Sequence, residues 1–596
     1  MLQGLFRTKN LDDILAAVGG PQFSLRRTLG AFNVTLIGIG AIIGAGIFAT
    51  VGSAAAGDPT AGRPGAGPSL MLSFAITAIV CGFTALCYAE LASMVPISGS
   101  AYTYSYATMG ELIAWIIGWD LIIEYAIGNV AVAISWAEYF HKLLLNLGIP
   151  FPHWLAADYR SAMILASESP EDYARLFGTA PEIFGVPLII NFLAFGIVAL
   201  LTIVLVWGIR ESASFNAGMV AVKVLVLLFF VGVALYFVPP SEMAANWRPF
   251  QPQGWSGTFA GAALVFFAYI GFDAVSTVAE ETKNPARDLP IGIIGSLIIC
   301  TIFYVVVAAV FTGLVPFPEL QKVSSSGQAE ALTMALDYVA PEGVTLPQTI
   351  VAFGSVVAHT AVLLVFQLGQ PRIFFSMARD GLLPPVFASI HPRFKTPHIT
   401  TILTGVFVGG IAAFANIESM LNLTNIGTLF AFLLVCLGIP ILRYKDPQRI
   451  RPFRVPFGPL LMPVLGAASC VFLMYYLAAD TWWRFIGWLV LGLSIYLAYG
   501  YTRSAIGAKL GRPSQTPVAL KIAALGFFLT SVGLFTVPHD VGVGGVFEAA
   551  FSATVDQHIR ALIGLGLIAG GLLLGVLGSV MVAATRPVGG NDGNQG

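Results

Sequence analysis

Charged residues are scarce in this chain. Only 10% of its 596 residues are Asp, Glu, Lys or Arg, and the formal net charge is −1. A protein that binds nucleic acid needs a clustered excess of Lys and Arg to neutralise phosphates, so this composition argues against a nucleic-acid partner. Hydrophobic residues make up 57% of the chain, which is more than a soluble globular protein carries. The chain is therefore predicted to lie in a lipid bilayer.

Cysteine is also rare. All five cysteines fall inside apolar segments. An odd number of cysteines without a CxxC pair predicts neither a disulfide framework nor a metal site, and no cofactor is expected. The first residues lack an apolar core followed by a small-residue cleavage site. We therefore expect no cleaved signal peptide, and we expect the first span to anchor the protein.

Long apolar runs, in contrast, are abundant. A helix needs about 20 residues to cross a hydrocarbon core of about 30 Å. Fourteen stretches meet this requirement, at about 31–53, 71–96, 110–146, 187–208, 215–238, 256–281, 291–315, 345–378, 399–415, 419–442, 459–479, 483–502, 518–537 and 560–584. The third and eighth exceed one crossing, which predicts tilt or an extension beyond the membrane. The sequence predicts an all-α integral membrane protein with outer loops at 147–186 and 316–344.

Lys and Arg residues gather between alternate spans, with the densest group at 443–454. The positive-inside rule then predicts that both termini are cytoplasmic, in a cell inner (plasma) membrane. Residues 1–30 are expected to form a cytoplasmic N-terminal segment. Residues 585–596 are expected to form a disordered cytoplasmic tail.

Two spans carry helix-weakening residues near mid-membrane. Residues 34–52 read VTLIGIGAIIGAGIFATVG and include Gly40 and Gly44, and residues 266–275 read FFAYIGFDAV and include Gly271. Each glycine weakens a helix by roughly 1 kcal/mol relative to alanine. The two segments lie in the first and sixth spans, which cross the membrane in opposite directions because five is odd. Two five-helix units would therefore be inverted copies, each opening with an interrupted helix. Interrupted helices at corresponding positions of inverted repeats mark the substrate site of secondary transporters.

An interrupted helix exposes backbone groups that can hold a ligand. Unwinding near Ile43, Gly44, Ala45 and Gly46 would free N–H groups at the positive end of a half-helix, which suits a carboxylate. Unwinding near Phe267, Ala268 and Ile270 would leave carbonyl groups that suit an ammonium. An α-amino acid offers both groups. The alternative is that these glycines are packing positions between membrane helices.

Five motifs resemble one known family. They are GAIIGAGIF at 40–48, PISGSAYTY at 96–104, WDLIIEYAIG at 119–128, FFAYIGFDAVSTVAEETKNPARDLPIGI at 266–293 and ARDGLLPPVF at 378–387. They resemble the amino acid–polyamine–organocation superfamily and, within it, the bacterial homologues of the cationic amino acid transporter family. The resemblance runs from about residue 25 to the end of the tenth span.

The resemblance implies the leucine-transporter-type fold, with discontinuous helices 1 and 6. Residues 31–238 and 256–442 would be the two inverted five-helix repeats, and residues 459–584 would add four helices. It also implies amino acid uptake by alternating access. The implied contacts are backbone amides near Ile43, Ala45 and Gly46 for the carboxylate, and carbonyls of Ile42, Phe267, Ala268 and Ile270 for the amine. Many relatives have serine or threonine at the position of Ala45, so a side-chain hydroxyl is missing here.

Lys223 lies in the apolar run AVKVLVLLFFVG of the fifth span. A lysine at the centre of a membrane helix is unfavourable by about 2.5 to 3.5 kcal/mol on insertion scales, so its presence requires a reason. Snorkelling is the alternative, but the side chain starts roughly 12 Å into the span. The resemblance suggests that its ammonium takes the place of sodium, so we expect proton coupling and no sodium site.

Four other ionisable residues fall in apolar spans. Glu124 could pair with Lys223, shape the substrate pocket or fix helix packing, and Asp120 precedes it by one turn on the same face. Asp273 follows the second break and could cap the half-helix there. His359 has no metal-type cluster around it, so a hydrogen-bonded packing role is expected.

The sequence thus predicts a proton-coupled amino acid symporter. An amino acid exchanger and a transporter-like nutrient sensor remain alternatives. No HExxH or GxSxG motif supports an intramembrane enzyme, and no repeated filter sequence supports a channel. The expected partners are the amino acid and the lipid bilayer. A small single-helix membrane subunit is left open.

Overall fold

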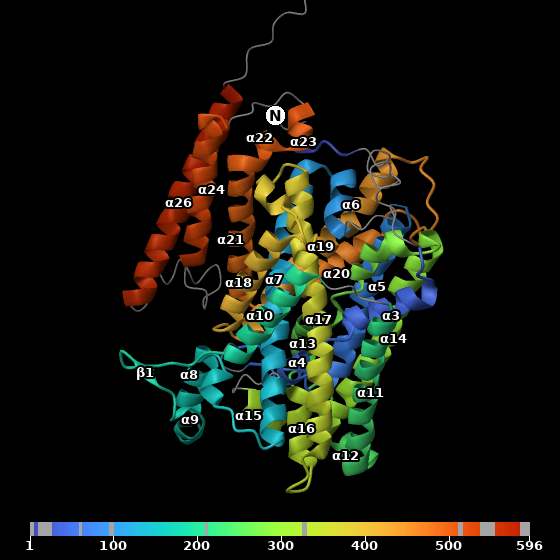
Figure 1. The fold of residues 1–596 in the computed structure, drawn as a ribbon, viewed down its shortest axis with the longest axis vertical. Helices are drawn as coiled ribbons and strands as arrows, with labels where there is room; N and C mark the ends of the chain where they lie inside the picture. The colour runs from blue at the N-terminus through green and yellow to red at the C-terminus, as the bar shows by residue number, and fades with distance from the viewer. Residues whose placement is uncertain are drawn as a thin grey trace, which may run out of the picture.

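The computed structural model describes residues 5–9, 27–58, 62–94, 100–208, 213–324, 330–509, 516–536 and 555–584. The predicted tail at 585–596 and most of the predicted N-terminal segment at 1–30 lie outside these residues. The described chain is mainly helical, and most long helices run roughly along the long axis of the molecule (Figure 1).

Within the described residues, ten helices are long and apolar enough to cross a membrane, or eleven if one bent pair counts as a single span. Three shorter apolar helices accompany them. Up to the second break, the helices of the predicted spans are α3 (Ala31–Ile42), α4 (Ala45–Ala56), α5 (Leu70–Met94), α7 (Glu111–Asn146), α10 (Phe192–Trp207), α11 (Ala213–Phe237) and α13 (Gly254–Val265). They are followed by α14 (Pro285–Leu314), α17 (Leu346–Arg379), α18 (His398–Ala412), α19 (Ile417–Lys445), α20 (Leu461–Tyr475), α21 (Ala479–Ile495), α24 (Val518–Thr536) and α26 (Val555–Ala584).

The long helix α7 forms the central column of the molecule. Its most apolar window is 94% buried, because α17 and α19 pack along it and α10 and α18 add further cover. A helix that is apolar on every side must be covered by other helices or by lipid. The expectation that the third and eighth spans exceed one crossing is met by α7 and α17, which have 36 and 34 residues.

The expected outer loops are partly ordered. Residues 147–186 contain a 3-10 turn (His153–Leu155), α8 (Tyr159–Glu168), α9 (Pro170–Phe177) and β1 (Glu182–Ile183), which pairs with β2 (Val186–Pro187) in an antiparallel hairpin. Residues 316–344 contain α15 (Phe317–Ser324) and α16 (Ala331–Val339). All of these elements lie toward the end of the molecule opposite the N-terminus (Figure 1).

The shorter helices complete the description. Their bounds are η1 (Gly67–Ser69), α6 (Ser100–Thr108), α12 (Pro240–Asn246), η3 (Phe266–Tyr269), η4 (Asp273–Glu281), η5 (Pro385–Ala388), the π-helix η6 (Tyr496–Gly500), α22 (Tyr501–Arg503) and α23 (Ala505–Lys509).

The last helices form a separate layer at one side. α24 and α26 pack closely on each other and, through α21, reach the central column (Figure 1). The α21 contact with α7 is made by the stacked indoles of Trp119 and Trp488, whose centroids are 4.4 Å apart. Each indole N–H donates to the backbone carbonyl of the other residue. These reciprocal hydrogen bonds fix the C-terminal layer to the helix that carries Glu124.

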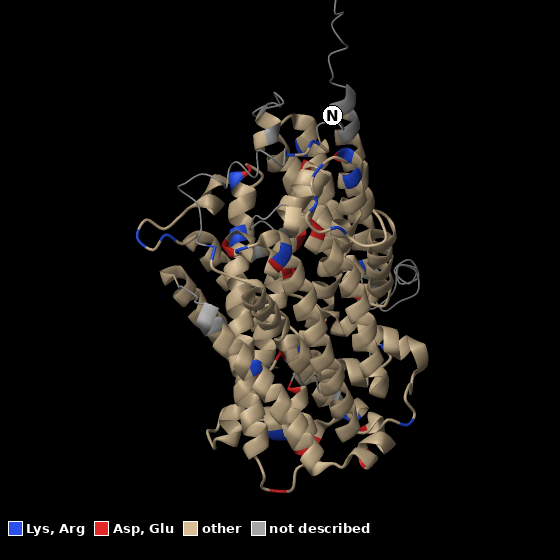
Figure 2. Cartoon of the chain, turned by 90° about the vertical axis from the view of Figure 1, so that its right-hand side faces the viewer, with Lys and Arg blue, Asp and Glu red and all other residues tan. Residues whose placement is uncertain are grey.

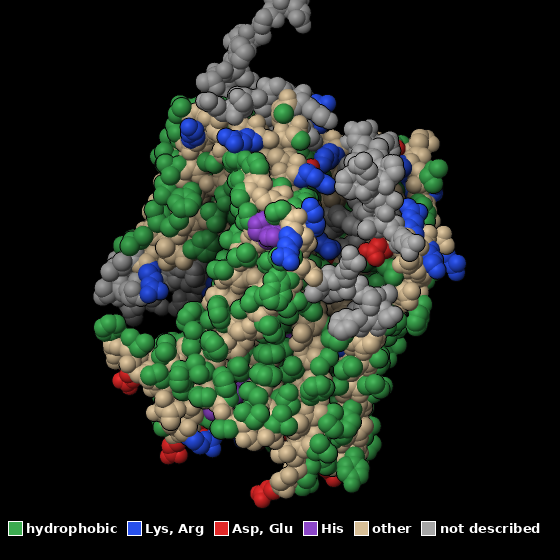
Figure 3. All heavy atoms as spheres, viewed as in Figure 1, with side chains coloured by type: hydrophobic (Ala, Val, Ile, Leu, Met, Phe, Trp, Pro, Cys, Tyr) green, Lys and Arg blue, Asp and Glu red, His purple; other side chains and the backbone are tan. Residues whose placement is uncertain are grey.

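The surface separates by charge. Lys and Arg are more frequent in the half that carries the N-terminus, as the blue segments of Figure 2 show. The other half is covered mainly by hydrophobic side chains on the face shown in Figure 3. Large apolar side chains such as Ile302 and Leu573 are more than half exposed. Exposing such apolar side chains to water is unfavourable, whereas contact with lipid is not.

Candidate functional site

The first predicted break is present. α3 ends at Ile42, α4 begins at Ala45, and the two axes are bent by 43°. Ile43 still donates its N–H to the Ile39 carbonyl at 2.8 Å, and Gly44 then leaves the helical conformation. Gly44 is required by close packing, since a Cβ atom there would lie 2.5 Å from Val362 of α17.

The start of α4 carries unused donors. Among the described residues, the N–H groups of Gly44, Ala45 and Gly46 have no hydrogen-bond partner, and no side chain caps the helix. The positive end of the α4 dipole lies at the same place. Backbone groups at this end are therefore available for a carboxylate without any charged side chain.

The second break is also present, in a different form. α13 ends at Val265, the chain continues as the 3-10 helix η3, and it turns at Gly271 before the 3-10 helix η4. Gly271 has a φ of +120°, a conformation that side chains rarely allow. Asp273 accepts a hydrogen bond from the Gly271 N–H at 3.2 Å. Asp273 thus stabilises the turn before η4. The predicted capping of the following half-helix is not found, because Asp273 is the first residue of η4 and no side chain caps that helix.

The two breaks lie directly against each other. A Cβ atom on Gly46 would overlap the backbone of Ala268, and one on Gly271 would lie 2.7 Å from the Ala41 carbonyl oxygen. In addition, the Tyr304 hydroxyl lies 2.8 Å from the Ile42 carbonyl and 2.9 Å from the Ala268 carbonyl. The breaks are therefore joined by glycine contacts and by one shared hydroxyl.

Most of the carbonyls predicted to hold an amine already accept a hydrogen bond. The single O–H of Tyr304 is shared between the Ile42 and Ala268 carbonyls, and the Ile270 N–H donates to the Phe267 carbonyl at 3.3 Å. Among the described residues, only the Ile270 carbonyl of the predicted set has no donor. Each carbonyl oxygen has two lone pairs, so a ligand amine could still bind.

Tyr304 was missed by the sequence analysis. It lies in the apolar run of α14, where the neighbouring residues suggest that a tyrosine only contributes to helix packing. The signal in the sequence was its hydroxyl, because a tyrosine hydroxyl that becomes buried requires a hydrogen-bond partner. Only the folded chain reveals which partner it has.

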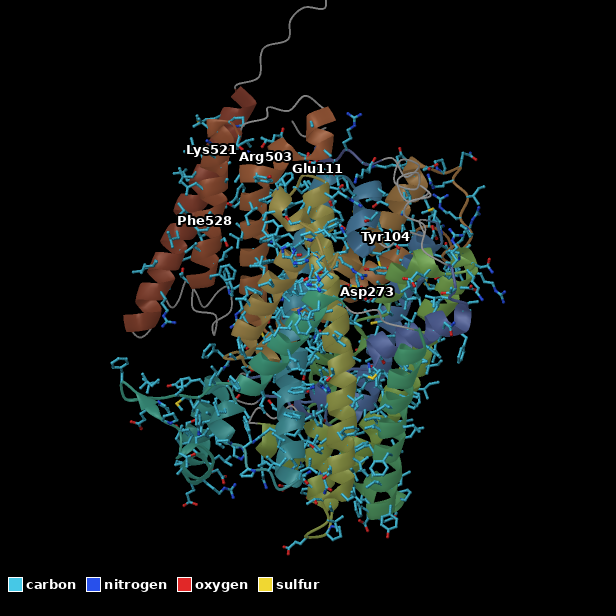
Figure 4. All side chains as sticks on the ribbon, in the orientation of Figure 1. Tyr104, Glu111, Asp273, Arg503, Lys521 and Phe528 are labelled. Carbon is cyan, nitrogen blue, oxygen red and sulfur yellow. The ribbon has the colours of Figure 1, made fainter. Side chains whose placement is uncertain are left out.

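A small cavity lies beside the breaks. Its volume is about 10 Å³, enough for about one water molecule. Its walls combine apolar side chains with two carboxyl groups, and the lining residues are Ala41, Glu124, Tyr125, Ile270, Gly271, Asp273, Ala274, Val362, Val365 and Phe366. A cavity of this size is too small for an amino acid. Asp273 lies near mid-height in the molecule (Figure 4).

Lys223 is buried, with 1% of its surface exposed, so it does not snorkel to the membrane surface. Its Nζ donates to the Gly40 carbonyl at 2.6 Å. In a continuous helix the Gly40 carbonyl would accept a hydrogen bond from the N–H of Gly44, but Gly44 lies in the break. The lysine of α11 thus binds the broken end of α3. No ion pair among the described residues joins it to Glu124.

Glu124 instead faces the small cavity. One of its carboxyl oxygens has no hydrogen-bond partner among the described residues. Asp120, one turn earlier on α7, is fully buried, and neither of its oxygens has a partner in the described part of the chain. His359 is fully hydrogen-bonded, with Nε2 2.8 Å from the Ser135 hydroxyl and Nδ1 2.7 Å from the Ser355 carbonyl. The histidine therefore has the packing environment that was expected.

Metal binding finds no support in the described residues, which contain no cluster of three or more His, Cys, Asp or Glu side chains arranged to hold an ion. The chemistry available at the breaks is hydrogen bonding by backbone groups, a buried ammonium and two carboxyl groups. These groups can bind a small zwitterion and move a proton.

Comparison with known proteins places this geometry in context. Residues 29–496 match the family model described as amino acid permease. The chain is 43% identical to the branched-chain amino acid permease BcaP of Bacillus subtilis over 85% of its own length and 100% of that protein. It is 39% identical to the methylthioribose transporter of the same organism, with the same coverage. It is 35% identical to the vacuolar cationic amino acid transporter 4 of Arabidopsis thaliana, over 75% of this chain and 68% of that protein.

Proposed function

The chain belongs to the amino acid permease family of the amino acid–polyamine–organocation superfamily, whose members here are transporters rather than enzymes, and we propose that it is a proton-coupled amino acid transporter. The observation that carries this proposal is the pair of facing breaks. Unused N–H groups at the start of α4 lie against the carbonyl-bearing segment η3, which offers complementary groups for an α-carboxylate and an α-amine. The protein is a multi-pass membrane protein.

The proposed architecture is the leucine-transporter type. In it, α3 to α11 and α13 to α19 form inverted five-helix repeats, and the remaining apolar helices bring the number of spans to fourteen. Support comes from the discontinuous first and sixth helices and from the three short apolar helices found where spans were expected. Lys and Arg are more frequent in the half of the molecule that carries the N-terminus. This distribution supports a protein of the cell membrane whose termini lie on the cytoplasmic side.

Aliphatic amino acids are the proposed substrates. The walls of the small cavity are mostly apolar and include Ile270, Val362 and Val365, although Glu124 and Asp273 also line it. A thermal-shift screen of the twenty amino acids on the purified protein tests this choice, because a ligand that binds only the folded state raises its apparent stability. Leucine, isoleucine and valine should give the largest shifts. A larger shift with arginine than with leucine would overturn the aliphatic assignment.

Lys223 is the proposed proton carrier. A protonated Nζ holds the Gly40 carbonyl, and loss of the proton would remove the charge from that hydrogen bond and loosen the break. Release of the proton would then accompany movement of α3 relative to α11.

The test uses proteoliposomes with labelled leucine and an imposed pH gradient. Accumulation should occur with acid outside and stop when the gradient is reversed. Lys223→Met should abolish this accumulation and leave exchange against internal leucine. Lys521→Met is the matched control, because Lys521 is an exposed residue of the distant helix α24 (Figure 4).

The exchanger alternative gives a different result. An exchanger would move label only when leucine is present inside, whatever the gradient. Equal uptake with acid inside and acid outside would remove proton coupling from the proposal. A protein that binds leucine but gives no saturable flux would be a nutrient sensor.

A further inference from the structure

Asp120 is a buried acid that has no task in the proposed binding of leucine or in the proposed action of Lys223. It lies on α7 one turn before Glu124, and none of its surface is exposed. Neither of its carboxyl oxygens has a hydrogen-bond partner among the described residues, and no ion pair reaches it there. At about 1.5 Å per residue it lies roughly 14 Å along the helix from Glu111, the first residue of α7. The carboxyl group is therefore deep inside the bundle and lacks a stabilising partner.

The carboxyl group of Asp120 is in direct contact with α19. A Cβ atom added to Gly427 of that helix would lie 3.0 Å from Oδ1 of Asp120. The neighbouring residue, Trp119, stacks on Trp488 of α21 and exchanges hydrogen bonds with it. The segment of α7 that carries Asp120 is thus held by two other helices, and α19 covers the carboxyl group itself.

The surroundings of Asp120 supply no positive charge. In the part of the chain that the structure describes, Glu124 is the one ionisable side chain whose charge acts on Asp120, and none on α17, α19 or α21 does so. One oxygen of Glu124 also lacks a partner. Lys223 donates instead to the Gly40 carbonyl. Like charges one turn apart on a helix repel each other, and a buried carboxylate without donors is unfavourable. The orphaned oxygens therefore call for an additional group at Asp120.

A proton is the occupant that requires the least from the surroundings. It needs only the carboxyl group itself. A metal ion needs several ligands, and the described residues contain no group of three or more His, Cys, Asp or Glu side chains arranged to hold one.

We propose that Asp120 is a second proton-binding residue of this transporter, which keeps its proton while α19 covers it and releases it to water when α7 and α19 separate. In the release step the O–H bond of the carboxylic acid breaks, the proton passes to water, and the electron pair stays on the carboxylate. The inference rests on the proposed proton coupling. Asp120 adds a proton to the cycle and does not replace Lys223, whose bond to the broken end of α3 is still required for net uptake.

The helix α7 connects Asp120 to the breaks. Glu124 lines the small cavity together with Asp273, and the Tyr139 hydroxyl, further along α7, donates to the Phe48 carbonyl of α4 at 3.0 Å. Movement at the breaks therefore acts on α7 and on its contact with α19. The coupling is reciprocal, because the protonated acid favours that contact and separation of the two helices favours release of the proton.

The number of protons that accompany each leucine tests the proposal. In proteoliposomes whose membrane potential is clamped at zero, each coupled proton lets a pH difference of about one unit, acid outside, raise the leucine concentration ratio about tenfold. The unmodified protein should reach about a hundredfold, and Asp120→Asn, which has no proton to release, about tenfold. Asp480→Asn is the matched control, because Asp480 of α21 pairs with Arg484 at 3.0 Å, and it should keep the ratio of the unmodified protein.

Infrared spectroscopy is the second measurement, and it requires no transport. A protonated carboxyl group has a C=O stretch separate from the bands of a carboxylate, and carbon-13 labelling of the aspartate side chains shifts it. The purified unmodified protein should show such an aspartate band at neutral pH, and Asp120→Asn should lose it. Absence of the band from the unmodified protein, or a band of equal intensity in Asp120→Asn, would overturn the proposal.

The flux results also separate this inference from the proposed function. If the pH gradient drives leucine accumulation equally in the unmodified protein and in Asp120→Asn, the second proton is refuted and proton-coupled transport stands. If the gradient drives no accumulation in the unmodified protein, proton coupling itself fails, and with it the part of Asp120 in transport. The infrared band then decides only whether Asp120 holds a proton.

Discussion

Replacing Gly271 by alanine tests how the two breaks are held together. Gly271 has a φ of +120°, which costs an alanine about 1 to 3 kcal/mol of backbone strain. The new Cβ would also lie 2.7 Å from the Ala41 carbonyl oxygen and 2.8 Å from its carbon. Those atoms are backbone and cannot turn aside, so overpacking adds about 1 to 3 kcal/mol. The conformation described here should lose roughly 2 to 6 kcal/mol in total.

A loss of that size changes the population of this conformation about thirtyfold or more, because each 1.4 kcal/mol is worth about a factor of ten. The assay is thermal unfolding of the purified variant together with leucine uptake in proteoliposomes, and both should fall. Gly295→Ala is the control. It makes the same chemical change in α14, where the nearest atom to the added Cβ is 3.6 Å away on Thr35.

Alanine is the better helix former at such a position, so the control should be neutral or slightly stabilising. If Gly271→Ala unfolds at the temperature of the unmodified protein and transports leucine at the same rate, the argument from strain and contact is wrong. The direct packing of the second break on Ala41 would then not be needed in any step of transport.

A further prediction concerns the hydroxyl that joins the two breaks. Tyr304→Phe should lower the free energy of unfolding by about 1 to 3 kcal/mol, since the one O–H shared by two buried carbonyls is lost. Leucine should recover part of the loss, and an unchanged melting temperature would contradict the bridge.

The helical character of the protein followed from the apolar runs. A helix satisfies every backbone group internally, so it is the default structure for such a run in lipid, and each predicted stretch contains a helix. Gly44 and Gly271 stand at the two breaks, whereas Gly40, which was also predicted to interrupt the first span, lies inside α3. Glycine weakens a helix but does not by itself end one. These properties depend on residues near one another in the chain.

The state of the site depended on residues far apart in the chain. Nothing near Tyr304 indicates that its hydroxyl would reach the Ile42 and Ala268 carbonyls, and nothing near Lys223 indicates that Gly40 rather than Glu124 would be its partner. A hydrogen bond is made or lost within a fraction of an ångström, which spacing in a sequence does not specify.

A second cavity, whose lining includes Glu138, Asp158 and Glu330, shows the same limit more strongly. Its acidic residues lie on α7, on the α8–α9 segment and before α16, and each alone would be taken for an ordinary charge in an outer loop or at a helix end. The sequence by itself determined which segments are helices, where two of them break and which backbone groups the breaks release. Only the tertiary structure decided which of those groups are already bound and which distant side chains enclose a cavity, because both depend on how helices pack across the whole chain.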